Sequence, residues 1–198
     1  MIILYLILSY LLGSIPWALI VGNVFYHTDI RKHGSGNLGG TNAGRVLGKT
    51  AGIAVTLLDA IKALIVVIFL SYINVNYAII SGLACTVGHC FPIFAGFRGG
   101  KGVATTYGYI FGVTIFITNN VILQFFVPIL LFFIILYLSK MVSFSSMLSL
   151  SIAVIISFFQ PNLTFAICLM ILVGFVIFQH RGNIQRIQNG TEKKITWM

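Results

Sequence analysis

The sequence has little charge, and almost none of it is negative. Only 8% of its 198 residues are charged, and the acidic ones are Asp29, Asp59 and Glu192. A soluble domain of this length could not cover its surface with so few charged side chains. Hydrophobic residues make up 59% of the chain. The composition therefore excludes an ordinary soluble protein and predicts a chain that is solvated by lipid.

Metal ligands are also scarce. The cysteines, Cys85, Cys90 and Cys168, all fall within apolar stretches, where cysteine is ordinarily a small hydrophobic side chain. His89 stands beside Cys90, but a metal site needs three or four ligands and nothing near them in the sequence completes one. We therefore expect no metal and no cofactor.

Long apolar segments fill most of the chain. A helix of about 20 apolar residues crosses a bilayer with all its backbone groups paired. Seven segments are predicted, at residues 2–22, 51–72, 77–95, 102–118, 120–138, 142–159 and 162–178. The first lacks the basic start and cleavage site of a signal peptide, so we expect it to be retained. The predicted fold is all-α, with seven transmembrane helices in a single domain over residues 1–198.

The basic residues predict the orientation, because short loops rich in Lys and Arg stay in the cytoplasm. All of them except Lys62 fall in alternate loops and in the tail. This pattern places the N-terminus outside, with cytoplasmic loops at 23–50 and 96–101 and a cytoplasmic tail at 179–198. The net charge of +9 then follows mainly from topology, with attraction to anionic lipid or substrate as a second cause.

Lys62 lies three residues after Asp59 in the second apolar segment, so the two share a helix face. Ionisable groups at that depth are costly. Two interpretations stay open. The pair either neutralises itself and orients its helix, or it supports a nearby active site.

Glycines and hydrogen-bonding residues fill the first cytoplasmic loop. Gly34, Gly36 and Gly39 match the dinucleotide fingerprint G-x-G-x-x-G, but that fingerprint needs a βαβ unit, and apolar helices flank this loop. We therefore exclude a Rossmann site and interpret the loop as anion-binding, because its glycines expose backbone N–H groups. The predicted contacts come from Ser35, Gly36, Asn37, Thr41, Asn42 and Arg45.

The next cytoplasmic loop also has the composition of a phosphate site. A nucleotide-hydrolysing P-loop is excluded, because Ala95 and Gly102 stand where glycine and Ser or Thr are needed around Lys101. Lys101 nevertheless precedes a predicted helix whose first amides can bind a phosphate oxygen. Gly99, Gly100 and Gly102 either form this site or simply make a tight turn.

Four further polar residues share the predicted cytoplasmic face. His180 and Asn183 fall on one helix face if the last helix continues, and His89 ends the third segment. Ser143 starts another helix, where capping is the commoner explanation. With few carboxylates on this face, the predicted site suits substrates that carry phosphate.

Three long motifs point to a family. They are HGSGNLGGTNAGRVLGK at 33–49, GHCFPIFAGFRGGKGVATTYG at 88–108 and HRGNIQRIQNGTEKK at 180–194. Through them the chain resembles the bacterial acyl-phosphate:glycerol-3-phosphate acyltransferase family over essentially its whole length. Its departures are Gly40 for the usual Ala, Arg98 for Lys and Lys140 for Arg, which conserve size or charge.

The resemblance implies transfer of a fatty acyl group from acyl phosphate to the 1-hydroxyl of glycerol 3-phosphate. The products would be lysophosphatidic acid and phosphate, in the first acylation step of phospholipid synthesis. The site would lie at the cytoplasmic face of a bacterial plasma membrane. The implied partners are the two substrates and membrane lipid. We expect no nucleic acid, and the sequence indicates no protein partner.

The resemblance also implies roles for residues. Arg45 and Lys101 would bind phosphate groups, and His180 and Asn183 would orient glycerol phosphate. Hydrogen bonds to substrate would come from Ser35, Asn37, Thr41 and Asn42. The proton of the attacking hydroxyl could pass to His180 or to the acyl phosphate, and a covalent route through Ser35 is a third option.

Two other functions are compatible with parts of the sequence. A small transporter or a protein that binds anionic lipid without catalysis fits the topology and charge, although no internal repeat is visible. A different phospholipid transferase would usually need acidic residues for a divalent metal, which the basic face lacks.

Overall fold

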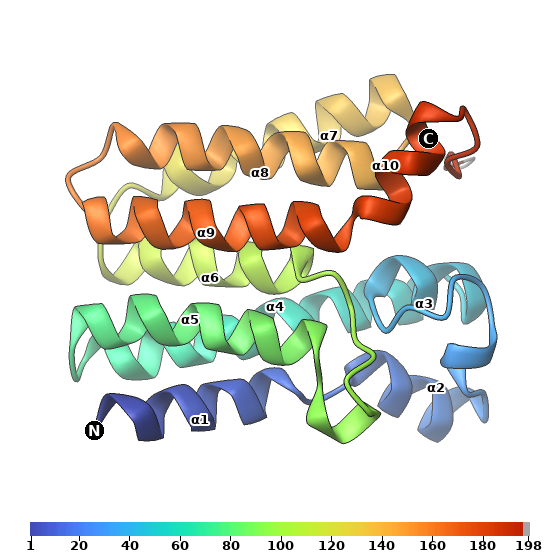
Figure 1. Ribbon diagram of the computed structural model, residues 1–198, viewed down its shortest axis with the longest axis horizontal. Coiled ribbons are helices and arrows are strands. Elements are labelled where there is room, and N and C mark those ends of the chain that lie inside the picture. Colours follow the sequence, from blue (N-terminus) through green and yellow to red (C-terminus); the bar gives the residue numbers. More distant parts are fainter. Residues whose placement is uncertain (196–198) are drawn as a thin grey trace. The chain divides into compact units, whose positions relative to one another are not determined.

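The computed structural model describes residues 1–195, and every regular element in that range is helical. The chain divides into two compact units, Met1–Gly112 and the chain from Val113 onward, which are described separately. The first unit contains α1 (Ile2–Gly13), α2 (Trp17–Tyr26), η1 (Ile30–Lys32), α3 (Gly40–Val46), α4 (Lys49–Ser71), α5 (Val75–Cys90), η2 (Ile93–Ala95) and most of α6 (Val103–Phe116). The second contains the π-helix η3 (Ile122–Phe126), α7 (Val127–Ser139), α8 (Val142–Phe158), α9 (Leu163–Gln179) and α10 (Arg181–Gln188) (Figure 1).

Each of the seven predicted apolar segments is helical, but they differ in length. Four stretches are long and apolar enough to cross a membrane: Ile2–Tyr26, Lys49–Ser71, Val75–Ala95 and Ile122–Ser139. The bent pair α9 and α10 makes a fifth if it is one span, whereas α6 and α8 are apolar but shorter. The described chain is therefore an all-helical membrane protein with four to five candidate spans.

The first predicted segment, 2–22, lies within one candidate span, Ile2–Tyr26, but this span consists of two helices with a break between them. Pro16 has no N–H group to donate, so α1 ends at Gly13 and α2 begins at Trp17. The Ser14 N–H still bonds to the carbonyl of Tyr10 at 2.8 Å. At the break, the carbonyl of Ile15 accepts a hydrogen bond from Lys62 Nζ of α4 at 3.4 Å.

Helices α1 and α5 pack side by side in the first unit (Figure 1). A Cβ atom on Gly88 would lie 2.2 Å from the carbonyl oxygen of Tyr10, so only glycine permits this approach. The Tyr10 hydroxyl donates to the carbonyl of Phe91 at 2.8 Å and ties the two helices together again. Close backbone packing of this kind is how helices associate in lipid, where burial of apolar surface gives no driving force.

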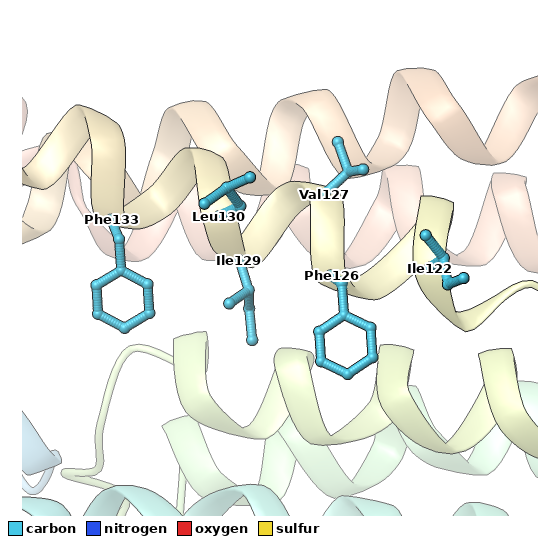
Figure 2. A pocket seen from close by; sticks show the side chains of 6 residues that line it. All are labelled: Ile122, Phe126, Val127, Ile129, Leu130 and Phe133. Atoms are coloured by element: carbon cyan, nitrogen blue, oxygen red, sulfur yellow. The ribbon is translucent and has the colours of Figure 1, made fainter.

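Helix α8 lies between α7 and α9 in the contacts of the second unit. It buries a row of serines, and several of their hydroxyl groups bond to carbonyls of the same helix, as Ser146 does to that of Val142 at 2.8 Å. Figure 2 shows that η3 and α7 instead present apolar side chains. These line a pocket of the second unit: Ile122, Phe126, Val127, Ile129, Leu130 and Phe133.

The glycine contact predicts a measurable effect on stability. Replacing Gly88 by Ala should lower the free energy of unfolding by about 1–3 kcal/mol, because the methyl group would overlap the Tyr10 carbonyl. Gly174→Ala in α9 is the control, since no atom outside its own helix lies within 4 Å of its Cβ position. Unfolding in detergent would be followed for both variants. Equal stabilities would contradict the packing.

Candidate functional site

Asn42 holds the first glycine-rich loop in shape. It lies in α3 and is 2% exposed. Its Oδ1 accepts a hydrogen bond from the Ser35 backbone at 2.8 Å, and its Nδ2 donates to the carbonyl of His33 at 3.2 Å. Both ends of the amide are thus used within the loop, so Asn42 positions its neighbours.

Three of the predicted binding residues near Asn42 are exposed. They are Ser35, Thr41 and Arg45. Thr41 and Arg45 are four residues apart in α3, so they are neighbours on one face of that helix. The arrangement presents two hydroxyl groups and one guanidinium on the same short stretch of chain, which are donors that suit an anion.

The two glycine-rich loops are joined directly. The Asn37 side chain donates to the carbonyl of Gly99 at 3.1 Å, and the Leu38 N–H donates to the same oxygen at 3.4 Å. Gly36 and Asn37 are half-buried at this junction. The structure therefore brings the two predicted loops into contact within the first unit, at Asn37 and Gly99.

The second loop folds back onto the end of α5. The N–H groups of Gly99 and Gly100 donate to the carbonyls of Cys90 and His89 at 3.2 and 3.1 Å. A Cβ atom on Gly100 would lie 2.0 Å from His89 Nε2, so the ring rests directly on the main chain there. These two amides serve the loop itself. The turn interpretation and the site interpretation of the glycines are thus compatible, because Lys101 and Gly102 follow at the start of α6.

Behind this loop lies a buried ionic cluster. Lys62 Nζ is 2.9 Å from Asp59 Oδ1, which confirms the predicted pairing on one face of α4. The same Nζ is 2.9 Å from His89 Nδ1 and 3.4 Å from the carbonyl of Ile15. His89 Nδ1 is also 3.3 Å from Asp59 Oδ1. No grouping of three or more His, Cys, Asp or Glu within residues 1–195 could hold a metal ion.

In the second unit, His180 lies at a bend. The last helix does not run straight on: α9 and α10 meet there at 58°. His180 Nδ1 is 2.8 Å from the carbonyl of Val176, which can only accept, so Nδ1 carries the ring hydrogen. In the neutral ring Nε2 is then the nitrogen with the lone pair, which is the state that accepts a proton from a hydroxyl group.

Glu192 connects Ser143 with Asn183, and no sequence pattern identified this role. The Ser143 hydroxyl and the Asn183 amide donate to Glu192 Oε1 at 2.7 and 2.6 Å, and Arg186 donates to Oε2 at 2.8 Å. Burial alone would raise the pKa of Glu192, but the hydrogen bonds from these three residues lower it below the usual value. The signal available in the sequence was that Glu192 is the one acidic residue in the basic tail at 179–198.

An exposed ion pair opens the first loop. Arg31 donates to both carboxylate oxygens of Asp29, at 2.9 and 2.8 Å. The hydrogen bond from the Arg31 side chain lowers the pKa of Asp29 to about 2. Exposed pairs contribute little to stability, so this one mainly shapes the turn at η1.

Comparisons with known proteins agree with one another. The model of the family described as "Glycerol-3-phosphate acyltransferase" matches residues 3–190. A protein of that name from Bacillus subtilis (strain 168) is 46% identical, covering 100% of both chains. One from Listeria monocytogenes (strain EGD-e) is 44% identical, covering 99% of this chain and 98% of its own.

Two crystal structures are similar throughout. They show PlsY, an integral membrane glycerol 3-phosphate acyltransferase, in its glycerol 3-phosphate form and its lysophosphatidic acid form. Both are 30% identical to this chain and cover 98% of it, with TM-scores of 0.90 and 0.89. The shares of those chains that are covered are 96% and 95%.

The Glu192 contacts predict a dependence of stability on pH. Because the folded-state pKa is lowered, the stabilisation is complete above the unfolded value of about 4.3 and is lost as the pH falls through the lower folded value. The free energy of unfolding of the wild type should therefore exceed that of Glu192→Gln at pH 7, and the gap should narrow on acidification. A gap that stays constant from pH 7 to pH 3 would contradict this assignment.

Proposed function

Because the chain belongs to the glycerol-3-phosphate acyltransferase family, as its motifs predicted, we propose that it transfers a fatty acyl group to glycerol 3-phosphate. The product is lysophosphatidic acid, and the donor is acyl phosphate, which leaves as inorganic phosphate. The match over residues 3–190 carries the proposal. The two forms of the similar crystal structures, with glycerol 3-phosphate and with lysophosphatidic acid, support the acceptor and the product.

The choice of acyl phosphate rests on its chemistry. It is a mixed anhydride and arrives already activated, so transfer needs no cofactor to activate the carboxyl group. The enzyme must hold the hydroxyl and the carbonyl together and stabilise the oxyanion and the departing phosphate. Cationic side chains and backbone amides supply that stabilisation, and both occur in the two glycine-rich loops.

Arg45 and Lys101 bind the substrate phosphates in this proposal. The exposed guanidinium of Arg45 can take two phosphate oxygens at once, whereas Lys101 acts as a point charge. Ser35 and Thr41 donate hydrogen bonds to the substrate from their exposed hydroxyl groups. Asn37 and Asn42 hold the main chain of the loops that carry these groups.

His180 is the proposed general base. With Nδ1 bonded to Val176, its Nε2 accepts the proton of the attacking hydroxyl group. The acyl phosphate can take that proton instead, which is the alternative. Attack by Ser35 would require a base to activate its hydroxyl, so we give Ser35 a binding role. Asn183, held by Glu192, orients glycerol phosphate.

The glycines of the two loops shape the phosphate-binding surface of the first unit in this proposal: Gly36, Gly99, Gly100 and Gly102. The other two predicted residues, His89 and Ser143, are buried and support the residues that they contact. The surface faces the cytoplasm of a bacterial cell, and the chain forms one domain with seven transmembrane helices and its N-terminus outside. The alternation of basic loops supports this topology, and the shorter apolar helices α6 and α8 supply the two further spans.

The first test is phosphate release by the purified protein, given palmitoyl phosphate without added metal. Release should depend on glycerol 3-phosphate and should match the lysophosphatidic acid formed. Replacing Ser35, Arg45, Lys101 or Asn183 by Ala should lower kcat/KM by about tenfold to a hundredfold, the effect of losing a hydrogen bond to a charged group. Replacing His180 by Ala should lower it by at least about a hundredfold, the effect of losing a general base.

Lys32→Ala is the matched control, because it removes an exposed cation from the same first loop. It should retain the wild-type rate. A folded, monodisperse preparation that forms no lysophosphatidic acid would refute the reaction, and a transporter or lipid-binding role would then be favoured.

Cysteine labelling in intact cells tests the number of spans. A membrane-impermeant maleimide should label Asn119→Cys, which lies outside if α6 crosses the membrane and inside if it does not. Val75→Cys and Lys193→Cys are the controls, since they lie outside and inside in both arrangements. Cys168 is replaced in all three. Labelling of Asn119→Cys only after permeabilisation would contradict the seven-helix topology.

A further inference from the structure

The contacts of Lys62 determine which nitrogen of His89 carries the hydrogen. An ammonium group donates up to three hydrogen bonds and accepts none. Its contacts here are Asp59 Oδ1, His89 Nδ1 and the carbonyl of Ile15. If Nδ1 carried a hydrogen, that N–H would lie 2.9 Å from an ammonium group that cannot accept it. Nδ1 is therefore the acceptor, and Nε2 of the neutral ring carries the hydrogen.

The opposite edge of the same ring rests on the second glycine-rich loop. On Gly100, a Cβ atom would lie 2.0 Å from Nε2 and 2.6 Å from Cε1 of His89. The Gly100 N–H also donates to the His89 carbonyl at 3.1 Å. The ring and the main chain of one residue thus hold the residue that directly precedes Lys101.

This part of the loop is also the one that contacts the first loop. The Gly99 carbonyl accepts hydrogen bonds from the Asn37 side chain and from the Leu38 N–H. A displacement of the His89 ring would therefore move Gly100, and through the main chain it would change the spacing between Lys101 and the first loop. The ion pair that orients the ring is buried, with Asp59 1% and Lys62 2% exposed.

We propose that Asp59, Lys62 and His89 are positioning residues for phosphate binding. Asp59 neutralises Lys62, Lys62 orients the His89 ring, and the ring fixes the main chain at Gly99 and Gly100. Lys101 then meets the substrate phosphate at a set distance from the first loop. This rests on the proposed function, because it takes Lys101 as a ligand of substrate phosphate. His89 acts on the substrate through the loop.

Hydrogen exchange tests the positioning without any reaction. His89→Leu removes both ring nitrogens but retains bulk, and the amides of Gly99 and Gly100 should exchange at least about tenfold faster than in the wild type. His89→Gln keeps an acceptor and an N–H donor and should restore much of the protection. His89 is changed and Lys62 is left intact, because losing Lys62 would leave a buried carboxylate without its partner.

Thr86→Val is the matched control for both measurements. Thr86 is buried one turn earlier in α5, and its hydroxyl bonds within that helix to the carbonyl of Gly82. In Thr86→Val, the exchange rates of the Gly99 and Gly100 amides and both kinetic constants should stay at wild-type values. Unchanged exchange at Gly99 and Gly100 in His89→Leu would overturn the proposal.

Kinetics then test whether His89 acts through Lys101. His89→Leu should raise the KM of the substrate whose KM Lys101→Ala also raises, by about tenfold, with kcat within about threefold of the wild type. In the Lys101→Ala background the same change should add less than about twofold, because the residue it positions is already gone. Equal effects in both backgrounds would indicate general damage and overturn the proposal.

The two proposals fail in different ways. If the wild type forms no lysophosphatidic acid, the proposed function is wrong, while the exchange measurement still decides whether His89 holds the loop. If the wild type is active and His89→Leu keeps the wild-type KM for both substrates, the positioning proposal is wrong and the proposed function stands.

Discussion

Polar groups inside lipid are stabilised by partners within the protein, and the buried ionic cluster of the first unit depends on this constraint. The break at Pro16 exposes the Ile15 carbonyl, and Lys62 reaches it from α4 at 3.4 Å. Lys62 needs a counter-ion at that depth, and Asp59 supplies it on the same helix face. Helix α5 must come close for His89 to join them, which Gly88 permits at the contact with α1. The backbone break, the ion pair and the glycine contact thus depend on one another.

The same constraint separates the residues that shape the loops from those that face solvent. The buried Asn42 side chain bonds to a backbone N–H and a backbone carbonyl, and the half-buried Asn37 side chain bonds to a backbone carbonyl. Ser35, Thr41 and Arg45 are exposed on the framework that results. Asn183 in the second unit is likewise held by a carboxylate of the tail. Asparagine in these motifs therefore orders the chain, whatever contacts it also makes with substrate.

Sequence reasoning succeeded where the signal is local. Apolar segments of the right length were helical, and the spacing of Asp59 and Lys62 predicted their contact, because both depend on neighbouring residues alone. The bend at His180 was not predicted, because hydropathy indicates which residues are apolar and gives no information on the direction of the helix beyond them. The contacts of His89 with Lys62 and of Ser143 with Glu192 join residues 27 and 49 positions apart. Such contacts depend on helix packing, which no single motif encodes.

The proposed site would recognise phosphate through cationic side chains that the chain itself positions. Metal-dependent sites fix an anion through an ion that the protein encloses, so precision comes from the coordination geometry. In the proposed site, a guanidinium on α3 and an ammonium just before α6 bind the phosphates, and the chain sets the distance between them. The hydrogen bonds between Asn37 and Gly99 and between Gly100 and His89 set that distance through short backbone links. Two flexible cationic side chains can then act at a defined spacing, because the main chain beneath them is fixed.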